Sequence, residues 1–376
     1  MMLSILWFIL IAVLWIGYLV LEGFDLGVAM LLPFVSKNDK ERTTALKTIG
    51  PHWDGNEVWL LTAGGAMFAA FPEWYATMFS GMYLALFVVL VLLILRIAAL
   101  EWRSKIATEK WRAMWDRFHV VAGYGVPILM GCAFANLVHG MKIEVVTRAG
   151  EVVPPEQVTP EVLANASHQL TGGFFSLLMP FNLLGGIAVA AICFSHAAQF
   201  LSLKTDGILR ERANAISGPA SIAATALAAV WVLWGQFAYA TSATSVFAWI
   251  PLVIAALALI AAAAFSQKQL RREGWAFICS TVAIAAAVAW IFTIMAPNVM
   301  KSSIAPEYSL TIEQASSTTG TLTVMTIVAV CLVPVVLAYT AWSYYTFRRR
   351  ISTKDVHENA GLLPQKIRLG ENFLAG

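Results

Sequence analysis

The chain has 376 residues, of which 59% are hydrophobic and only 12% are charged, and its mean hydropathy is +0.72. A soluble protein of this length would carry about twice that charged fraction, so the composition excludes a soluble domain and indicates an integral membrane protein. The net charge of +3 favours anionic lipid as a partner. No basic patch occurs in the sequence context of a nucleic-acid reader, so we expect no nucleic-acid partner.

Nine apolar runs divide the chain, and most are long enough to cross roughly 30 Å of hydrocarbon. The second run has only 15 residues, so its polar beginning should lie inside the membrane zone or in protein. We therefore expect an all-α polytopic membrane protein, with one transmembrane domain over residues 1–347 and a polar cytoplasmic tail over 348–376. The predicted spans are 3–35, 57–71, 76–100, 118–138, 171–201, 217–237, 246–265, 275–296 and 320–347.

The positive charges predict the orientation of the chain. Of 25 basic residues, 21 fall in alternate connections and the tail, three fall in the intervening connections, and Arg96 lies in a span. Lysine and arginine are retained on the cytoplasmic side, which places the amino terminus outside and the carboxyl terminus in the cytoplasm. An odd number of spans requires the same arrangement.

The first predicted span contains two carboxylates, Glu22 and Asp25, within an apolar run that continues for ten residues to the first lysine. Ionisable groups inside spans usually line a functional path, so both are candidates for a proton path. The structural alternative is that Glu22 marks the end of the span. Gly23 and Gly27 are four residues apart and would let another helix approach closely enough to shield the acids from lipid.

The second predicted span begins with the sequence PHWDGNEVW over residues 51–59. Asp54 and Glu57 stand three residues apart, so a helix places both on one face, and Trp59 lies further in. With the chain oriented as above, they lie toward the cytoplasm with Glu22 and Asp25 and form a candidate proton entrance. The structural alternative is that Asp54 or Asn56 caps the helix.

Arg96 lies at the inner end of the third predicted span. Spacing alone favours a snorkelling side chain that reaches the interface. The functional alternative makes Arg96 the charge partner of a membrane carboxylate.

Haem and metal ligation receive little support from the six histidines and four cysteines, because none of them forms a cluster with ligand spacing. His196 is the least poor haem candidate, and a hydrogen-bonded structural role is the preferred interpretation for it. We therefore expect no haem ligand and no metal ligand in this chain, and no catalytic residue of its own.

Several segments resemble subunit II of the cytochrome bd-type quinol oxidases: GFDLG at 23–27, PHWDGNEVW at 51–59, AGGAMFAA at 63–70, and shorter matches around Arg96, 103–105, 111–116, 309–323 and 339–344. The likeness covers nearly the whole chain and is weakest between about residues 142 and 272. Enteric members carry glutamine where Glu57 stands and aspartate where Glu22 stands. These differences affect the role expected for Glu57, and they leave the family resemblance unchanged.

The resemblance implies a multi-pass protein of the bacterial inner membrane, built as two four-helix bundles plus one helix. It would pair pseudo-symmetrically with a subunit I that holds haem b and haem d and oxidises quinol while reducing oxygen to water, electrogenically but without pumping. The resemblance also implies a cytoplasmic proton entrance at Asp54 with Asp25 near it, and an oxygen route near Trp59. It further allows a quinone bound in this subunit and small single-helix accessory subunits.

Two other functions fit the same residues. A proton-coupled secondary transporter also uses membrane carboxylates and glycine-interrupted helices, although no convincing inverted repeat is present. A scaffold for haem assembly would tolerate neutral replacement of the membrane acids.

Overall fold

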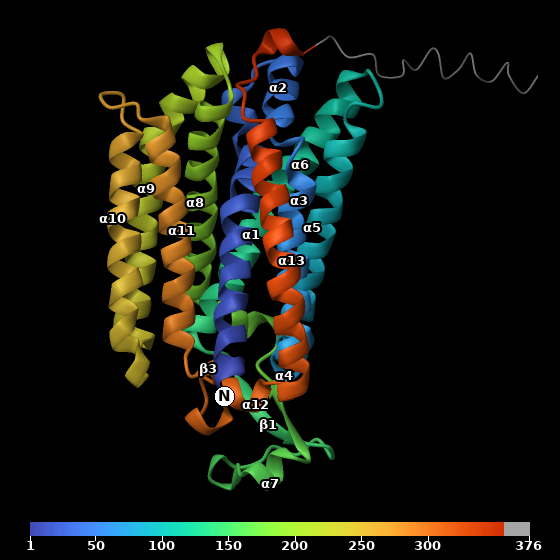
Figure 1. Ribbon diagram of the computed structural model, residues 1–376, viewed down its shortest axis with the longest axis vertical. Helices are drawn as coiled ribbons and strands as arrows, with labels where there is room; N and C mark the ends of the chain where they lie inside the picture. The colour runs from blue at the N-terminus through green and yellow to red at the C-terminus, as the bar shows by residue number, and fades with distance from the viewer. Residues whose placement is uncertain (357–376) are drawn as a thin grey trace, which may run out of the picture.

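A computed structural model describes residues 1–356 of the protein; residues 357–376, which include His357 and most of the predicted tail, lie outside the described part. The predicted all-α architecture is confirmed, since long parallel and antiparallel helices make up almost the whole molecule (Figure 1). The long helices are α1 (Met2–Val35), α3 (Trp53–Ala70), α5 (Tyr83–Trp102), α6 (Glu109–His139), α8 (Pro180–Lys204), α9 (Gly207–Tyr239), α10 (Trp249–Phe265), α11 (Glu273–Met295) and α13 (Thr319–Thr346). The short helices are α2 (Asp39–Ile49), α4 (Pro72–Gly81), α7 (Pro160–Leu163) and α12 (Ile312–Ala315).

Eight helices among residues 1–356 are long and apolar enough to cross a membrane. The second predicted span corresponds to α3, which has 18 residues but carries two acids and an asparagine at its start. It nevertheless runs beside α1 and α13 within the molecule (Figure 1). The count of nine spans therefore stays a prediction that depends on α3.

The long helices form two groups of four with one helix beside them, as the resemblance implies. One group contains α1, α3, α5 and α6, and the other contains α8, α9, α10 and α11. Contacts of α1 and α6 with α8 join the two groups, and α13 lies against α1 and α3. The chain thus places residues of α1, α3 and α5 within one bundle.

Two predicted span boundaries are wrong. The run 76–100 is divided at Met82, because α4 ends at Gly81 and α5 begins at Tyr83. Gly81 lies so close to Leu170 that a Cβ atom on Gly81 would overlap the Leu170 side chain. This close contact occurs where the helix is interrupted between α4 and α5. The run 171–201 becomes helical only at Pro180, where a proline at the first helical position starts α8.

Glycine brings α1 into close contact with its neighbours, as predicted for Gly23 and Gly27. A Cβ atom at Gly27 would lie 2.5 Å from the Ala197 Cβ of α8, and one at Gly23 would lie 3.5 Å from the Cys193 sulfur. On the other side, Gly123 of α6 packs on the backbone of α1 near Leu26. The middle of α1 is therefore enclosed by protein, which explains how its acids are kept from lipid.

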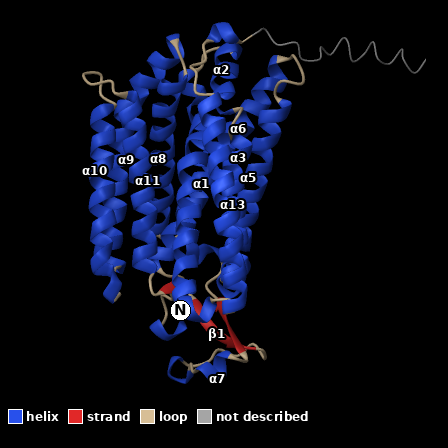
Figure 2. Ribbon diagram, viewed as in Figure 1, coloured by secondary structure: helices blue, strands red, loops and turns tan. Residues whose placement is uncertain are grey.

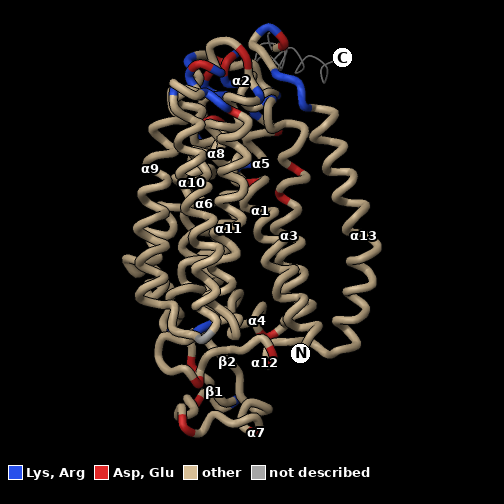
Figure 3. The backbone as a smooth tube through the Cα atoms, turned by 60° about the vertical axis from the view of Figure 1, so that its left-hand side comes forward, with Lys and Arg blue, Asp and Glu red and all other residues tan. Residues whose placement is uncertain are grey.

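The two ends of the molecule differ in structure and charge. One end carries two short antiparallel sheets, β1 (Ile143–Thr147) with β2 (Ala166–Leu170) and β3 (Asn298–Met300) with β4 (Leu310–Thr311), as Figure 2 shows. The opposite end carries α2 and most lysine and arginine residues (Figure 3). This segregation matches the charge bias that predicts a cytoplasmic face.

The segment that follows α13 crosses the charged end of the molecule. The ammonium group of Lys204 donates to the carbonyl oxygens of Phe347 and Arg349, and Ile351 pairs with Thr205 in a short parallel bridge. Arg350 also forms an ion pair of 2.7 Å with Glu273. The described part of the predicted tail is thus fixed to α8 and α11.

Helix α13 is held mainly at its two ends. Near its start, Trp7 of α1 donates to Thr326 at 3.0 Å, and near its end Tyr344 donates to Asn56 at 2.8 Å. Between these contacts, all residues from Val330 to Tyr339 are exposed, whichever side of the helix they occupy. The middle of α13 therefore has apolar surface on every side that this chain does not cover.

Candidate functional site: a buried arginine shared by three carboxylates

Arg96 is completely buried on α5 and lies among three carboxylates from two other helices. Its Nη1 atom is 2.5 Å from Glu22 Oε1 of α1 and 3.4 Å from Glu57 Oε2 of α3, and its Nη2 atom is 4.0 Å from Asp25 Oδ2 of α1. The prediction of a snorkelling arginine is wrong, because packing of α1, α3 and α5 keeps the side chain inside the protein. The alternative interpretation of Arg96 as a charge partner agrees with this geometry.

Asp25 is also held by an amide on α3. Asn56 Nδ2 donates to Asp25 Oδ2 at 2.7 Å, and Asn56 Oδ1 accepts from the Tyr344 hydroxyl of α13 at 2.8 Å. The Tyr344 ring stacks on His52 with the centroids 4.1 Å apart and the planes 3° from parallel. Burial, and then nearby Lys204, lower the pKa of His52 to about 4, so its ring is neutral at physiological pH.

The charges in this cluster do not balance if every group is ionised. Three carboxylates face one guanidinium, so full ionisation would leave two surplus negative charges inside the membrane zone. Such a surplus is costly in a medium of low polarisability, and the uptake of two protons by the carboxyls removes it. Asp25 Oδ1 and Arg96 Nε lack a hydrogen-bond partner among residues 1–356. The arrangement is chemically suited to hold and exchange protons.

Asp54 lies apart from this cluster, on the exposed side of α3. It lines a cavity of about 640 Å³ bounded mainly by α3, α4, α5 and α6, and Glu57 lines the same cavity. The prediction that both acids share one face of a helix is confirmed. Glu57 therefore faces the cavity while its carboxylate lies 3.4 Å from Arg96, so it connects the two environments.

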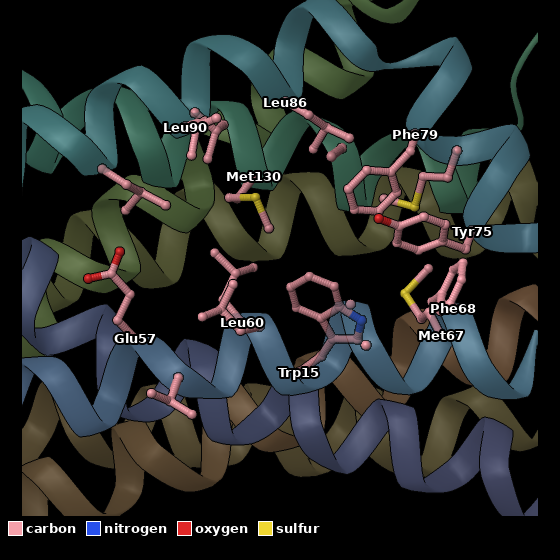
Figure 4. Close-up of a pocket in the computed structure, with 18 of the residues that line it drawn as sticks. Trp15, Glu57, Leu60, Met67, Phe68, Tyr75, Phe79, Leu86, Leu90 and Met130 are labelled. Atoms are coloured by element: carbon pink, nitrogen blue, oxygen red, sulfur yellow. The ribbon is translucent and has the colours of Figure 1, made fainter. Parts of the chain in front are cut away.

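The rest of the cavity is apolar. Figure 4 shows Glu57 at one end, Trp15 and Met130 midway, and Tyr75, Phe68 and Phe79 at the other end. The Tyr75 and Phe79 rings stack with centroids 4.0 Å apart. The cavity thus has one acidic end and one aromatic end, along the length of α3.

Trp59 does not belong to the residues that line this cavity. Its ring lies against Gly17 of α1, where a Cβ atom would come within 2.7 Å of Trp59 Cδ2. Trp59 follows Glu57 by two positions, about 200° around the helix, so it lies on a different side of α3. Trp59 therefore packs between α3 and α1.

Sequence reasoning assigned no role to Tyr344 or His52, and for Asn56 it offered only a capping role. The helix α3 begins at Trp53 with His52 at its N-cap, so the structural alternative, in which Asp54 or Asn56 caps the helix, is wrong. Asn56 could have been singled out as a polar residue inside the 51–59 motif, whereas the contact of Tyr344 links residues 288 positions apart. Only the fold brings that tyrosine to the site.

His196 has partners for both ring nitrogens. Nδ1 lies 2.6 Å from the Ser280 hydroxyl, and Nε2 donates to the Val20 carbonyl oxygen at 3.2 Å. These contacts fit the hydrogen-bonded structural role preferred for this residue.

The fold and the site together define a multi-pass membrane protein with a buried cluster of three carboxylates and one arginine. A sequence model of the family described as "Cytochrome bd terminal oxidase subunit II" matches residues 3–347. The chain belongs to this family, and it is a multi-pass protein of the bacterial inner membrane.

Individual relatives support the same assignment. The chain is 36% identical to cytochrome bd-I ubiquinol oxidase subunit 2 of Escherichia coli K12, over 95% of this chain and 97% of that protein. It is 38% identical to cytochrome bd ubiquinol oxidase subunit 2 of Bacillus subtilis, over 93% and 97% of the two chains. The bd oxidase structure from Geobacillus thermodenitrificans matches with a TM-score of 0.70 at 15% identity, covering 92% of this chain and 99% of that one, which supports the fold.

Family membership fixes the general role of the chain. It is a subunit of a respiratory quinol oxidase, an oxidoreductase complex that carries haems and contains a partner subunit I.

Proposed function

We propose that this chain supplies the cytoplasmic proton entrance of the oxidase, while subunit I holds haem b and haem d and oxidises the quinol. The observation that carries the proposal is the position of Glu57, which faces the cavity beside Asp54 and also approaches Arg96. Protons would pass from Asp54 to Glu57 and then to the carboxylates Glu22 and Asp25. Arg96 would hold these acids together and limit how many protons they keep.

The overall reaction of a quinol oxidase explains why protons would flow in this direction. Reduction of one oxygen molecule to two waters consumes four electrons and four protons, and two quinols supply the electrons and release four protons. The haems of the complex would supply electron transfer and oxygen binding. If this chain draws the consumed protons from the cytoplasm while quinol protons leave outside, charge is separated across the membrane without a pump. The acids lie toward the basic end of the molecule, which fits intake from the cytoplasm.

Replacement of Asp54 by asparagine tests the proton entrance. In the complex purified through a tag on this chain, Asp54→Asn is expected to lower quinol-driven oxygen consumption at least about twofold, because the first acid of the path can no longer exchange a proton. The haem b and d bands in the optical spectrum should keep their wild-type intensity. Glu101→Gln, an exposed acid at the same end of the molecule, is the matched control.

Two results would contradict parts of this proposal. Normal oxygen consumption together with normal charge translocation in Asp54→Asn would remove Asp54 from the path. A colourless preparation from an otherwise intact complex would remove the oxidase role and favour a proton-coupled transporter, whose uptake would then proceed in liposomes that contain this chain alone.

We further propose that oxygen reaches subunit I along the apolar side of α3 near Trp59. Trp59→Leu is expected to change the rate of oxygen binding severalfold, because it alters the packing of α3 on α1 beside Gly17. Flash-photolysis kinetics of oxygen binding measure this rate. Unchanged kinetics would leave Trp59 with a packing role only.

The cavity of about 640 Å³ is our candidate site for a quinone held as a structural ligand. Its volume and its aromatic and aliphatic lining suit an apolar ring with an isoprenoid tail. Lipid extraction and mass spectrometry of the purified complex would detect such a quinone, and its absence would leave the cavity to lipid.

A further inference from the structure

His119 is a buried histidine on α6 that the proposed proton path does not use. It is 2% exposed, and neither ring nitrogen has a hydrogen-bond partner among residues 1–356. Buried polar groups in native proteins are almost always paired with protein or with ordered water. Both nitrogens therefore need partners from outside the described residues, and ordered water is the usual partner of such groups.

Along α6, His119 lies between the level of the Arg103–Asp116 cluster and the level of the Arg96 cluster. Three residues earlier on the same helix, Asp116 accepts from Arg103 Nε at 2.6 Å, and Arg103 also pairs with Asp39 of α2 at 2.6 Å. Three-residue spacing puts Asp116 and His119 on one side of α6. Arg96 and Arg103 both lie close enough to His119 to act on it electrostatically.

On the neighbouring helix α5, the residues of the two charged clusters follow the same order along the membrane normal as they do along α6. Arg96 and Arg103 are seven residues apart on α5, with Ala99 between them, and all three are buried. Positions i, i+3 and i+7 share one side of a helix, so the small Ala99 lies level with the gap between the two arginines. One turn beyond His119, Gly123 packs directly on α1 near Leu26, beside Asp25.

We propose that His119 relays protons between the Arg103–Asp116 cluster at the cytoplasmic face and the Arg96 cluster, along a hydrated column separate from the cavity that Asp54 and Glu57 line. A neutral imidazole accepts a proton at one nitrogen and releases the proton of the other, so the ring returns to its neutral state after each transfer. The receiving group is Glu22 beside Arg96, in a cluster where acids outnumber the guanidinium. This inference rests on the proposed function.

Two parallel routes predict a particular pattern of turnover in the complete complex. If the routes share the flow equally, His119→Leu and Glu57→Gln should each lower oxygen consumption by about twofold, and the double variant by about 100-fold. His119→Gln, which binds water but does not relay a proton, should behave like His119→Leu. His139→Leu, at the outer end of the same helix, is the control and should leave turnover unchanged.

A second measurement does not depend on turnover or on the folding of variants. A map of the wild-type complex that resolves ordered water should contain water within hydrogen-bond distance of both His119 nitrogens. Three results would each overturn the relay. The first is a map without water at the His119 nitrogens. The second is a loss of turnover in the double variant no larger than the product of the losses in the two single variants, and the third is wild-type turnover of Glu57→Gln/His119→Gln. If Asp54→Asn and Asp25→Asn are also without effect, the proposed function itself fails; if they slow turnover, only this inference fails.

Discussion

Replacement of Arg96 by leucine is expected to leave almost no assembled complex in the membrane. Glu22, Asp25 and Glu57 would lose the guanidinium that they share, and Glu22 and Asp25 are completely buried. Removal of one partner of a buried ion pair costs about 3–5 kcal/mol, which is a large share of the stability of a typical domain. The amount of complex can be measured from the haem bands of washed membranes and by native gel electrophoresis.

Compensating substitutions separate this electrostatic explanation from a general packing defect. Neutralising two of the three acids in the Arg96→Leu background, with Glu22→Gln and Glu57→Gln, should restore part of the assembled complex, because fewer charges remain unpaired. Arg117→Leu removes an exposed arginine at the same end of the molecule and serves as the control. Normal assembly of Arg96→Leu alone would show that the cluster does not stabilise the fold.

Asp25→Asn is expected to reduce oxygen consumption by about 100-fold, with the haem content of the complex maintained. In the proposed scheme, Asp25 would lie beyond the point where the Glu57 route and the His119 route meet at Arg96, so its loss should affect both routes. The asparagine keeps the size of the side chain, and its carbonyl oxygen can still accept from Asn56. The measurement is turnover of purified complex with quinol in excess.

Asp25→Glu is the informative companion, because it retains a titratable carboxyl and should recover part of the activity. If Asp25→Asn instead yields no assembled complex, while Asp25→Glu assembles normally, Asp25 has a structural role. Wild-type turnover of Asp25→Asn would exclude it from the proton path.

The helical architecture was predictable because bilayer thickness imposes long apolar runs, and these are visible in a single sequence. The predicted helix boundaries were wrong where tertiary contacts determine them. The break at Met82 accompanies the contact between Gly81 and Leu170, and these residues are far apart in the chain. The membrane position of α3 also depends on neighbours, since its polar first turn gives a weak hydropathy signal.

The candidate site was predictable only in part. Helical spacing put Asp54 and Glu57 on one side of α3, and both line the cavity. The same local reasoning favoured a snorkelling Arg96, because spacing within α5 contains no information about carboxylates on α1. The contact from Tyr344 to Asn56 joins distant parts of the chain, so no local pattern could reveal it.

The exposed middle of α13 makes the fate of this subunit depend on its partner. When the chain is alone in the bilayer, lipid covers the apolar surface of this ten-residue stretch, and only the contacts at its two ends hold α13 against the rest of the chain. A partner that covers this stretch binds the folded form and not the unfolded one, so it raises the stability of the chain in proportion to the logarithm of its own concentration. Matched amounts of the two subunits would then arise from mutual protection after synthesis, with orphan copies of this chain being the first to unfold.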